Sequence, residues 1–182
     1  MMTPDGQEKG ERGFSYILMI RSKFLPTVLT IILLDQWLKY WVIKNIPLHE
    51  GFSIIPRFFD ILHARNTGSA FSLFAESSSF LVRWGLSLIS LVALAGILYV
   101  FFRFPQLNWI QRWGLTLVWG GAAGNLIDRV RWGYVVDFLD VYAGSYHWPT
   151  FNVADSAITV GIILMLWDQL RSKQEPIKPP LP

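Results

Sequence analysis

Residues 151–167 read FNVADSAITVGIILMLW, a stretch that begins like a membrane-spanning helix but carries an aspartate, Asp155, one turn inside it. An ionised side chain is costly beside hydrocarbon, so such an acid marks a functional site by default. Asp155 also has a purely structural interpretation. Asn152 stands where a helix N-cap is expected, and Asp155 follows three residues later, as in a capping box that complements the helix dipole.

Three more blocks of the chain approach the roughly 20 apolar residues that cross a bilayer. With 52% hydrophobic and 15% aromatic residues and a mean hydropathy of +0.36, the chain is unusually apolar for a soluble domain. We therefore expect an all-α membrane protein with four transmembrane helices in one domain over residues 24–170. The four blocks are residues 24–43, 80–102, 113–130 and 153–170.

The basic residues outside these blocks predict the orientation, because cytoplasmic flanks collect Lys and Arg. They are Lys9, Arg12, Arg21, Lys23, Arg103, Arg112, Arg171, Lys173 and Lys178. In a four-span chain all of these positions lie on one side of the membrane. We therefore expect cytoplasmic tails at residues 1–23 and 171–182, and outward loops near residues 45–79 and 131–152. The net charge of +3 follows from this bias, so no nucleic-acid partner is expected.

The first outward loop contains FSIIPRFFDILHARN, residues 52–66, which alternates weakly and is rich in Ile and Phe. This pattern predicts short strands in a small extramembrane sheet. The absence of cysteine excludes thiol catalysis and Cys-ligated metal sites. His49, His63 and His147 lack ligand spacing, so neither a metal nor another cofactor is expected.

Several polar residues are expected at the outer ends of the third and fourth spans. Asn125, Asp128 and Arg129 have the i, i+3 and i+4 spacing of one helical face. Asp137 interrupts the apolar run GYVVDFLDVY at the same level as Asp155. Two acids at one interfacial site, without an HExxH helix, a GxSxG turn or a cysteine, indicate paired-carboxylate chemistry.

Such a pair has a clear physical requirement. Two carboxylates that share a proton cannot both ionise, so near neutral pH one is an acid and the other a base. The base deprotonates a water molecule and the acid donates to the scissile carbonyl. The hypothesis is therefore aspartic peptide hydrolysis without an acyl-enzyme. Asp140, nearby in the same loop, is expected to be a solvated surface acid.

Four blocks in order resemble the signature blocks of the lipoprotein signal peptidases, or signal peptidase II. They are DQWLK (35–39), NTGSAFSLF (66–74), GGAAGNLIDRVRWGYVVDF (120–138) and WPTFNVADSAI (148–158), and the resemblance covers about residues 27–170. Ser69 departs from the alanine usual in the family, and the N-terminal tail is longer than typical. The resemblance implies an intramembrane aspartic endopeptidase of the bacterial inner membrane. Its implied substrate is a diacylglyceryl-modified prolipoprotein, cut just before the lipidated cysteine.

The resemblance also implies roles for individual residues. Asp137 and Asp155 correspond to the catalytic pair. The supporting positions are Asn66, Asn125, Arg129, Asn152, Asp35 and Lys39. The i,i+4 spacing of Asp35 and Lys39 lets them neutralise each other inside the bilayer and tether the first helix.

Some interpretations stay open at this point. Arg129 could pair with Asp128, hold an outward loop or bind substrate carbonyls. Asp128 is regarded as structural. Gly120, Gly121 and Gly124 are expected to permit close approach of a helix or a substrate backbone.

Other expectations concern mechanism, motion and assembly. A Ser–Lys pairing of Ser69 or Ser72 with Lys39 is compatible with the spacing, although neither serine has a candidate base nearby in the sequence. Residues 52–74 are expected to close over the substrate as a lid. We expect a monomer whose partners are the prolipoprotein and membrane lipid. The alternative function is a small proton-coupled transporter or channel subunit, which would need acids through both halves of the membrane.

Overall fold

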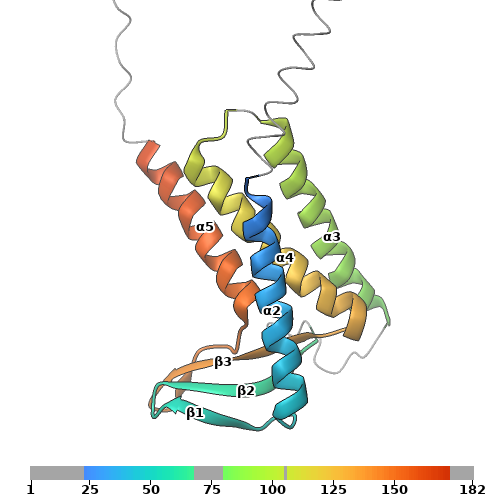
Figure 1. Cartoon of the computed structure of the whole chain (residues 1–182), viewed down its shortest axis with the longest axis vertical. Coiled ribbons are helices and arrows are strands. Elements are labelled where there is room, and N and C mark those ends of the chain that lie inside the picture. Colours follow the sequence, from blue (N-terminus) through green and yellow to red (C-terminus); the bar gives the residue numbers. More distant parts are fainter. Residues whose placement is uncertain (1–22, 68–79, 105, 173–182) are drawn as a thin grey trace, which may run out of the picture.

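The computed structural model describes residues 23–67, 80–104 and 106–172. Within these residues it contains four helices and a four-stranded sheet, so the expected helices and the small sheet are confirmed (Figure 1). The helices are α2 (Leu25–Asn45), α3 (Phe80–Arg103), α4 (Trp109–Trp132) and α5 (Val153–Ser172). The strands are β1 (Gly51–Ile55), β2 (Phe59–Asn66), β3 (Val135–Ala143) and β4 (Tyr146–His147).

Helix α4 begins earlier than its apolar block because a capping box precedes that block. The Asn108 side chain accepts from the Gln111 backbone N–H, and the Gln111 side chain accepts from the Asn108 backbone N–H. At the other end Gly133 has a φ of 79°, a left-handed conformation that glycine adopts without strain. This glycine ends the helix and turns the chain into β3.

Helix α4 contacts each of the other three described helices and is the centre of the bundle. The sheet lies at one end of the bundle (Figure 1). The start of α2, the end of α3, the start of α4 and the end of α5 all lie at the opposite end. The basic residues of these ends, Lys23, Arg103, Arg112 and Arg171, therefore share one end of the molecule.

The sheet has the order β1-β2-β3-β4, and its paired strands are antiparallel. Strands β1 and β2 fall in the segment predicted to form strands. Strand β3 was not predicted as a strand, although it carries Asp137. Its first four residues, Val135–Phe138, are all buried, so they lack the alternation of a half-buried strand. Ala64 of β2 pairs with Asp137, which places the end of β2 beside this acid.

The helices expose many large apolar side chains and bury several charged ones. Large apolar side chains are exposed along the helices, for example Leu33, Trp37, Leu88, Ile89, Val92, Ile163, Trp167 and Leu170. The side chains of Asp35, Lys39 and Asp128 are buried instead, with exposed fractions of 0%, 2% and 1%. An extensive exposed apolar surface of this kind marks contact with a membrane or a partner.

One described helix is long and apolar enough to cross a membrane by itself, the segment Val153–Arg171 of α5. Helix α3 contains a shorter apolar stretch, Ser87–Phe101. Four helices are therefore shown, whereas four membrane crossings are not, and the membrane insertion of the helices stays a prediction. The expected tails, residues 1–23 and 171–182, lie outside the described residues except for residues 23, 171 and 172, and residues 68–74 of the expected lid (52–74) also lie outside them.

Two glycines of α4 allow its neighbours to approach closely, as predicted. A side chain at Gly121 would collide with the Ala154 carbonyl of α5. A Cβ at Gly124 would lie 2.8 Å from the Asp35 carboxylate of α2. These contacts bring the first turn of α5 and the middle of α2 against the same part of α4.

Candidate active site

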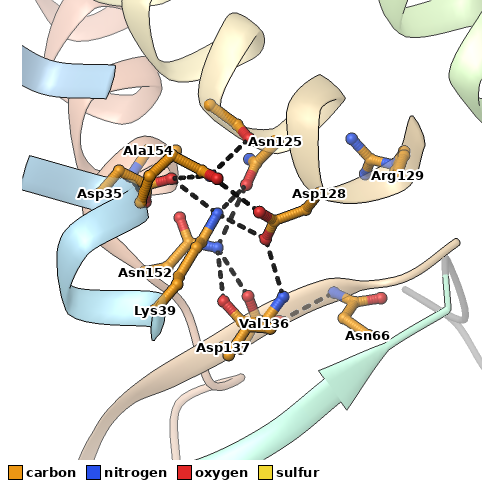
Figure 2. Close-up of polar contacts among 12 residues, drawn as sticks. Asp35, Lys39, Asn66, Asn125, Asp128, Arg129, Val136, Asp137, Asn152 and Ala154 are labelled. Carbon is orange, nitrogen blue, oxygen red and sulfur yellow. Dashed lines mark hydrogen bonds and ion pairs between the residues drawn. The ribbon is translucent and has the colours of Figure 1, made fainter. Parts of the chain in front are cut away.

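The structure places Asp137 and Asp155 in one polar cluster. Asp137, on β3, has an exposed fraction of only 3%. The Asn152 amide donates to Asp137 Oδ1 at 2.7 Å, and the Asn66 amide donates to Asp137 Oδ2 at 3.0 Å (Figure 2). The Asn125 amide donates to Asp155 Oδ1 at 2.7 Å. Asn152 also donates to Asn125 Oδ1 at 3.2 Å, so the asparagines link the two acids.

The Asp155 carboxylate faces this cluster, while Asn152 caps the helix. Asn152 Oδ1 accepts from the Asp155 backbone N–H at 2.8 Å, which satisfies a free donor of the first turn of α5. In a full capping box the Asp155 side chain would bond back to the Asn152 backbone. Asp155 Oδ1 accepts from Asn125 instead. The side chain that caps α5 is therefore that of Asn152, and the Asp155 carboxylate is not used as a cap.

The environment of Asp137 shifts its ionisation. Burial, and then the charge of Asp155, raise the pKa of Asp137 from 3.8 to about 7. Hydrogen bonds from Asn66 and Asn152 and the charge of Lys39 lower this pKa and offset part of the rise. With a pKa of about 7, Asp137 can hold a proton at pH values where an ordinary aspartate is ionised.

The expected ion pair of α2 is present and belongs to a larger network. Lys39 Nζ lies 2.8 Å from Asp35 Oδ2 and 2.9 Å from Asp128 Oδ2. It also donates to Asn125 Oδ1 at 3.0 Å. Lys39 thus tethers α2 to α4, as predicted. Its three partners match the three protons of an ammonium group, which disfavours a role as the base of a serine nucleophile.

Gln36 is a polar residue of the cluster that the sequence interpretation missed. Its amide donates to Asp128 Oδ1 at 2.8 Å, to the Gly124 carbonyl at 3.2 Å and to Asp35 Oδ2 at 3.3 Å. The available signal was its position in the block DQWLK, directly after Asp35. A glutamine in an apolar helix is a donor that needs buried acceptors.

Of the three interpretations of Arg129, an ion pair with Asp128 is not found, because the ionic partner of Asp128 is Lys39. The Arg129 guanidinium donates to Ser90 Oγ of α3 at 3.3 Å. It also interacts electrostatically with Asp155, Asp137 and Asp128. Figure 2 shows its side chain set apart from the bonded cluster. The interpretations that remain for Arg129 are holding a loop and binding substrate.

The expectation that Asp140 is a solvated acid is wrong. Its exposed fraction is 6%, and its Oδ2 lies 2.8 Å from His147 Nδ1. The cause is the β3–β4 hairpin, which turns β4 back along β3 and brings His147 beside the acid. An exposed acid close to the sheet is instead Glu50, just before β1.

Residues 23–67, 80–104 and 106–172 contain no group of three or more His, Asp or Glu side chains that could hold a metal ion. His63 and His147 have other contacts. His63 Nδ1 lies 2.9 Å from the Ile46 carbonyl, and His147 pairs with Asp140.

At the end of the bundle away from the sheet, the described part of α5 carries a buried acid, Asp168. It accepts hydrogen bonds from Asn108 and Gln111 at the start of α4. These bonds join the end of α5 to the start of α4. Asp168 thus has a structural role, and it gives no specific support to the alternative function of a proton-coupled transporter.

Comparisons with known proteins agree on one family. The family model described as "Signal peptidase (SPase) II" matches residues 27–171. The "Lipoprotein signal peptidase" of Solibacter usitatus is 40% identical over 159 residues, which are 86% of this chain and 95% of that protein. The "Lipoprotein signal peptidase" of Desulforapulum autotrophicum is 43% identical over 155 residues, which are 85% of this chain and 94% of that protein.

Two solved structures are similar over most of their length. One, described as "Bacterial membrane enzyme structure by the in meso method at 2.3 A resolution", has a TM-score of 0.77 and 28% identity. It covers 88% of this chain and 95% of its own. The second, described in the same words at 1.9 A resolution, has a TM-score of 0.73 and 31% identity, with coverage of 82% and 93%.

Proposed function

Since this chain belongs to the signal peptidase II family, we propose that it removes the signal peptide of prolipoproteins by aspartic catalysis with Asp137 and Asp155. One observation carries the proposal. Two acids that are distant in the sequence meet in one cluster, linked through Asn152 and Asn125, and the pKa of Asp137 is raised to about 7. An acid that holds a proton near neutral pH, beside a second acid, is what general acid–base hydrolysis needs.

In the proposed reaction Asp137 begins protonated and Asp155 begins ionised. Asp155 removes a proton from a water molecule, and the resulting hydroxide attacks the scissile carbonyl carbon. Asp137 donates its proton to the carbonyl oxygen, which gives a neutral tetrahedral intermediate. As the C–N bond breaks, Asp155 passes its proton to the leaving nitrogen and Asp137 recovers its proton from a hydroxyl of the intermediate. Both carboxyl groups end in their starting states.

The asparagines serve to orient the two carboxyl groups. Asn66 and Asn152 each bond one oxygen of Asp137, and Asn125 bonds Asp155. Amides fix these side chains without adding a charge that would ionise both acids. Arg129, which interacts electrostatically with both acids, is proposed to bind substrate carbonyls.

We also propose that the helices of residues 24–170 cross the inner membrane four times, with cytoplasmic ends and an active site near the outer face. Exposed apolar side chains on α2, α3 and α5 support the crossings. The basic helix ends, which lie at the end of the bundle away from the sheet, support the orientation. The protein acts as a monomer in this proposal, with membrane lipid around its helices.

The proposed substrate carries a diacylglyceryl group on the cysteine that follows the cleaved bond. Each methylene that enters the bilayer contributes about 0.8 kcal/mol to anchoring, so the lipid holds the substrate at the interface and sets its depth. Asp137 lies on β3 and Asp155 in the first turn of α5, where the bundle meets the sheet, and we propose that the anchored substrate backbone reaches this level.

The test is cleavage of one prolipoprotein peptide prepared with and without the diacylglyceryl group. The full-length protein is used in lipid, and products are identified by mass spectrometry. We expect cleavage of the lipidated peptide directly before its cysteine and at least tenfold slower cleavage of the other. Equal rates for the two peptides, or a cut at another bond, would contradict the proposed substrate.

A further inference from the structure

The residue that precedes each acid of the pair is bound by a buried carboxylate. The Val136 backbone N–H, directly before Asp137, donates to Asp128 Oδ2 at 3.1 Å. The Ala154 backbone N–H, directly before Asp155, donates to Asp35 Oδ1 at 2.9 Å. Hydrogen bonds to ionised acceptors are among the strong ones in proteins, so these contacts fix the backbone beside each acid.

Two side chains of α2 join these carboxylates to each other. Lys39 Nζ lies within ion-pair distance of both, 2.8 Å from Asp35 and 2.9 Å from Asp128 (Figure 2). Gln36 donates to Asp128 at 2.8 Å and to Asp35 at 3.3 Å. A short polar path therefore runs from β3 through α4 and α2 to α5.

We propose that Lys39, with Asp35 and Asp128, is a positioning device that sets the separation of Asp137 and Asp155. The proposal rests on the function proposed above and assigns no chemical step to these three residues. Asp128 is a new member of the machinery, since the sequence interpretation regarded it as structural. The path consists of Val136, Asp128, Lys39, Asp35 and Ala154.

An ammonium group suits the centre of this path for two reasons. Asp35 and Asp128 approach the same point, and two buried carboxylates would repel each other without a cation between them. The third proton of Lys39 goes to Asn125 Oδ1, which orients that amide so that its nitrogen donates to Asp155. Lys39 thus acts on Asp155 through Asn125 as well as through the backbone.

The ammonium also acts on Asp137 at longer range. Its charge lowers the pKa of Asp137, against the raising effects of burial and of Asp155. The other cation facing the pair is Arg129 of α4. Removing the charge of Lys39 should therefore raise the pKa of Asp137, in addition to loosening the geometry.

The experiment compares Lys39→Met with Lys44→Met in the full chain. Lys44 is exposed in the last turn of α2, so its substitution removes the same charge from the same helix outside the network. Both variants are assayed with lipidated peptide, with kcat and KM determined separately between pH 5 and pH 9.5. We expect Lys39→Met to lower kcat at least tenfold, to change KM less than about threefold and to move the basic limb of the kcat/KM profile to higher pH. Lys44→Met should behave like the parent.

Two conservative variants test the same path from its ends. Asp35→Asn and Asp128→Asn keep an oxygen acceptor for the backbone N–H and remove the charge that holds Lys39. Each should lower kcat, and each combined with Lys39→Met should be no worse than Lys39→Met alone, because residues that act as a unit do not lose function additively. If Lys39→Met fails to insert or fold, Lys39→Gln and the two aspartate variants decide the question.

The proposal is overturned if Lys39→Met keeps kcat within twofold of the parent. A lower kcat with an unmoved basic limb, or additive losses in the double variants, also overturns it, since general destabilisation would give that result. Asp137→Asn and Asp155→Asn are assayed in parallel. Cleavage by either variant would refute the proposed function itself. If both are inactive while Lys39→Met cleaves like the parent, only the positioning role of Lys39 is refuted.

Discussion

The pH dependence of cleavage follows from the environment of Asp137. As the general acid, Asp137 must hold its proton when substrate is bound. Its pKa lies at about 7 rather than 3.8 because the side chain is buried and faces Asp155. Raising the pH through 7 removes this proton from the free enzyme. The protonated fraction then falls about tenfold for each further pH unit, so kcat/KM, which reports the free enzyme, should at pH 9 be roughly one hundredth of its maximum.

The assay is cleavage of a fluorogenic lipidated peptide in lipid micelles at subsaturating concentration, with kcat/KM measured from pH 5 to pH 9.5. Asn66→Ala supplies the matched perturbation, because the Asn66 hydrogen bond lowers the pKa of Asp137. The basic limb of its kcat/KM profile should move to higher pH, even if its maximal kcat/KM is lower. A flat kcat/KM between pH 6 and pH 9, or a limb that Asn66→Ala leaves in place, would refute the assignment of Asp137 as the acid.

Three further predictions concern stability and topology. Because the pKa of Asp137 is raised from 3.8 to about 7 in the folded protein, folding favours the protonated acid. This preference adds about 4 kcal/mol to the free energy of unfolding below pH 4, and the addition is lost as the pH rises through 7. Asp137→Asn should therefore gain Tm relative to the parent at pH 8 but not at pH 4, and equal differences at both pH values would contradict the burial argument. Gly121→Val should lose at least about 1–3 kcal/mol of stability by collision with Ala154, whereas Gly96→Val on α3 meets nothing within 4 Å and should keep its Tm. A reporter fused to the C-terminus should be cytoplasmic and one inserted at residue 78 should be outside, and the reverse result would overturn the proposed orientation.

The helices and the first two strands could be predicted because each depends on a local pattern. Long apolar blocks indicate helices regardless of their neighbours, and residues 52–66 show the composition of strands. The proximity of Asn125, Asp137 and Asp155 was also accessible, because the expected membrane topology places all three at one level. The capping box at Asn108 was a local signal as well, but it lies before the apolar block and was overlooked.

The remaining features depend on contacts between distant segments. Strand β3 is buried on both faces, so its sequence shows an apolar run rather than alternation. Asp140 is buried because His147 folds back onto it. The bonds from Val136 to Asp128 and from Ala154 to Asp35 join residues eight and 119 positions apart, and no spacing rule connects the second pair. The positioning network could therefore be recognised only in three dimensions.

The most direct test of the catalytic pair is cleavage by Asp155→Asn. Asn152 caps α5 through its own side chain, and an asparagine at position 155 can still accept from Asn125, so the fold should persist. Glu50→Gln, at an exposed acid, is the control and should cleave normally. We expect Asp155→Asn to insert, bind lipidated peptide and lose at least about a thousandfold in kcat, because the base is gone. Substantial cleavage by this variant, or inactivity caused by unfolding and lost substrate binding, would show that Asp155 is a structural residue and contradict the proposed mechanism.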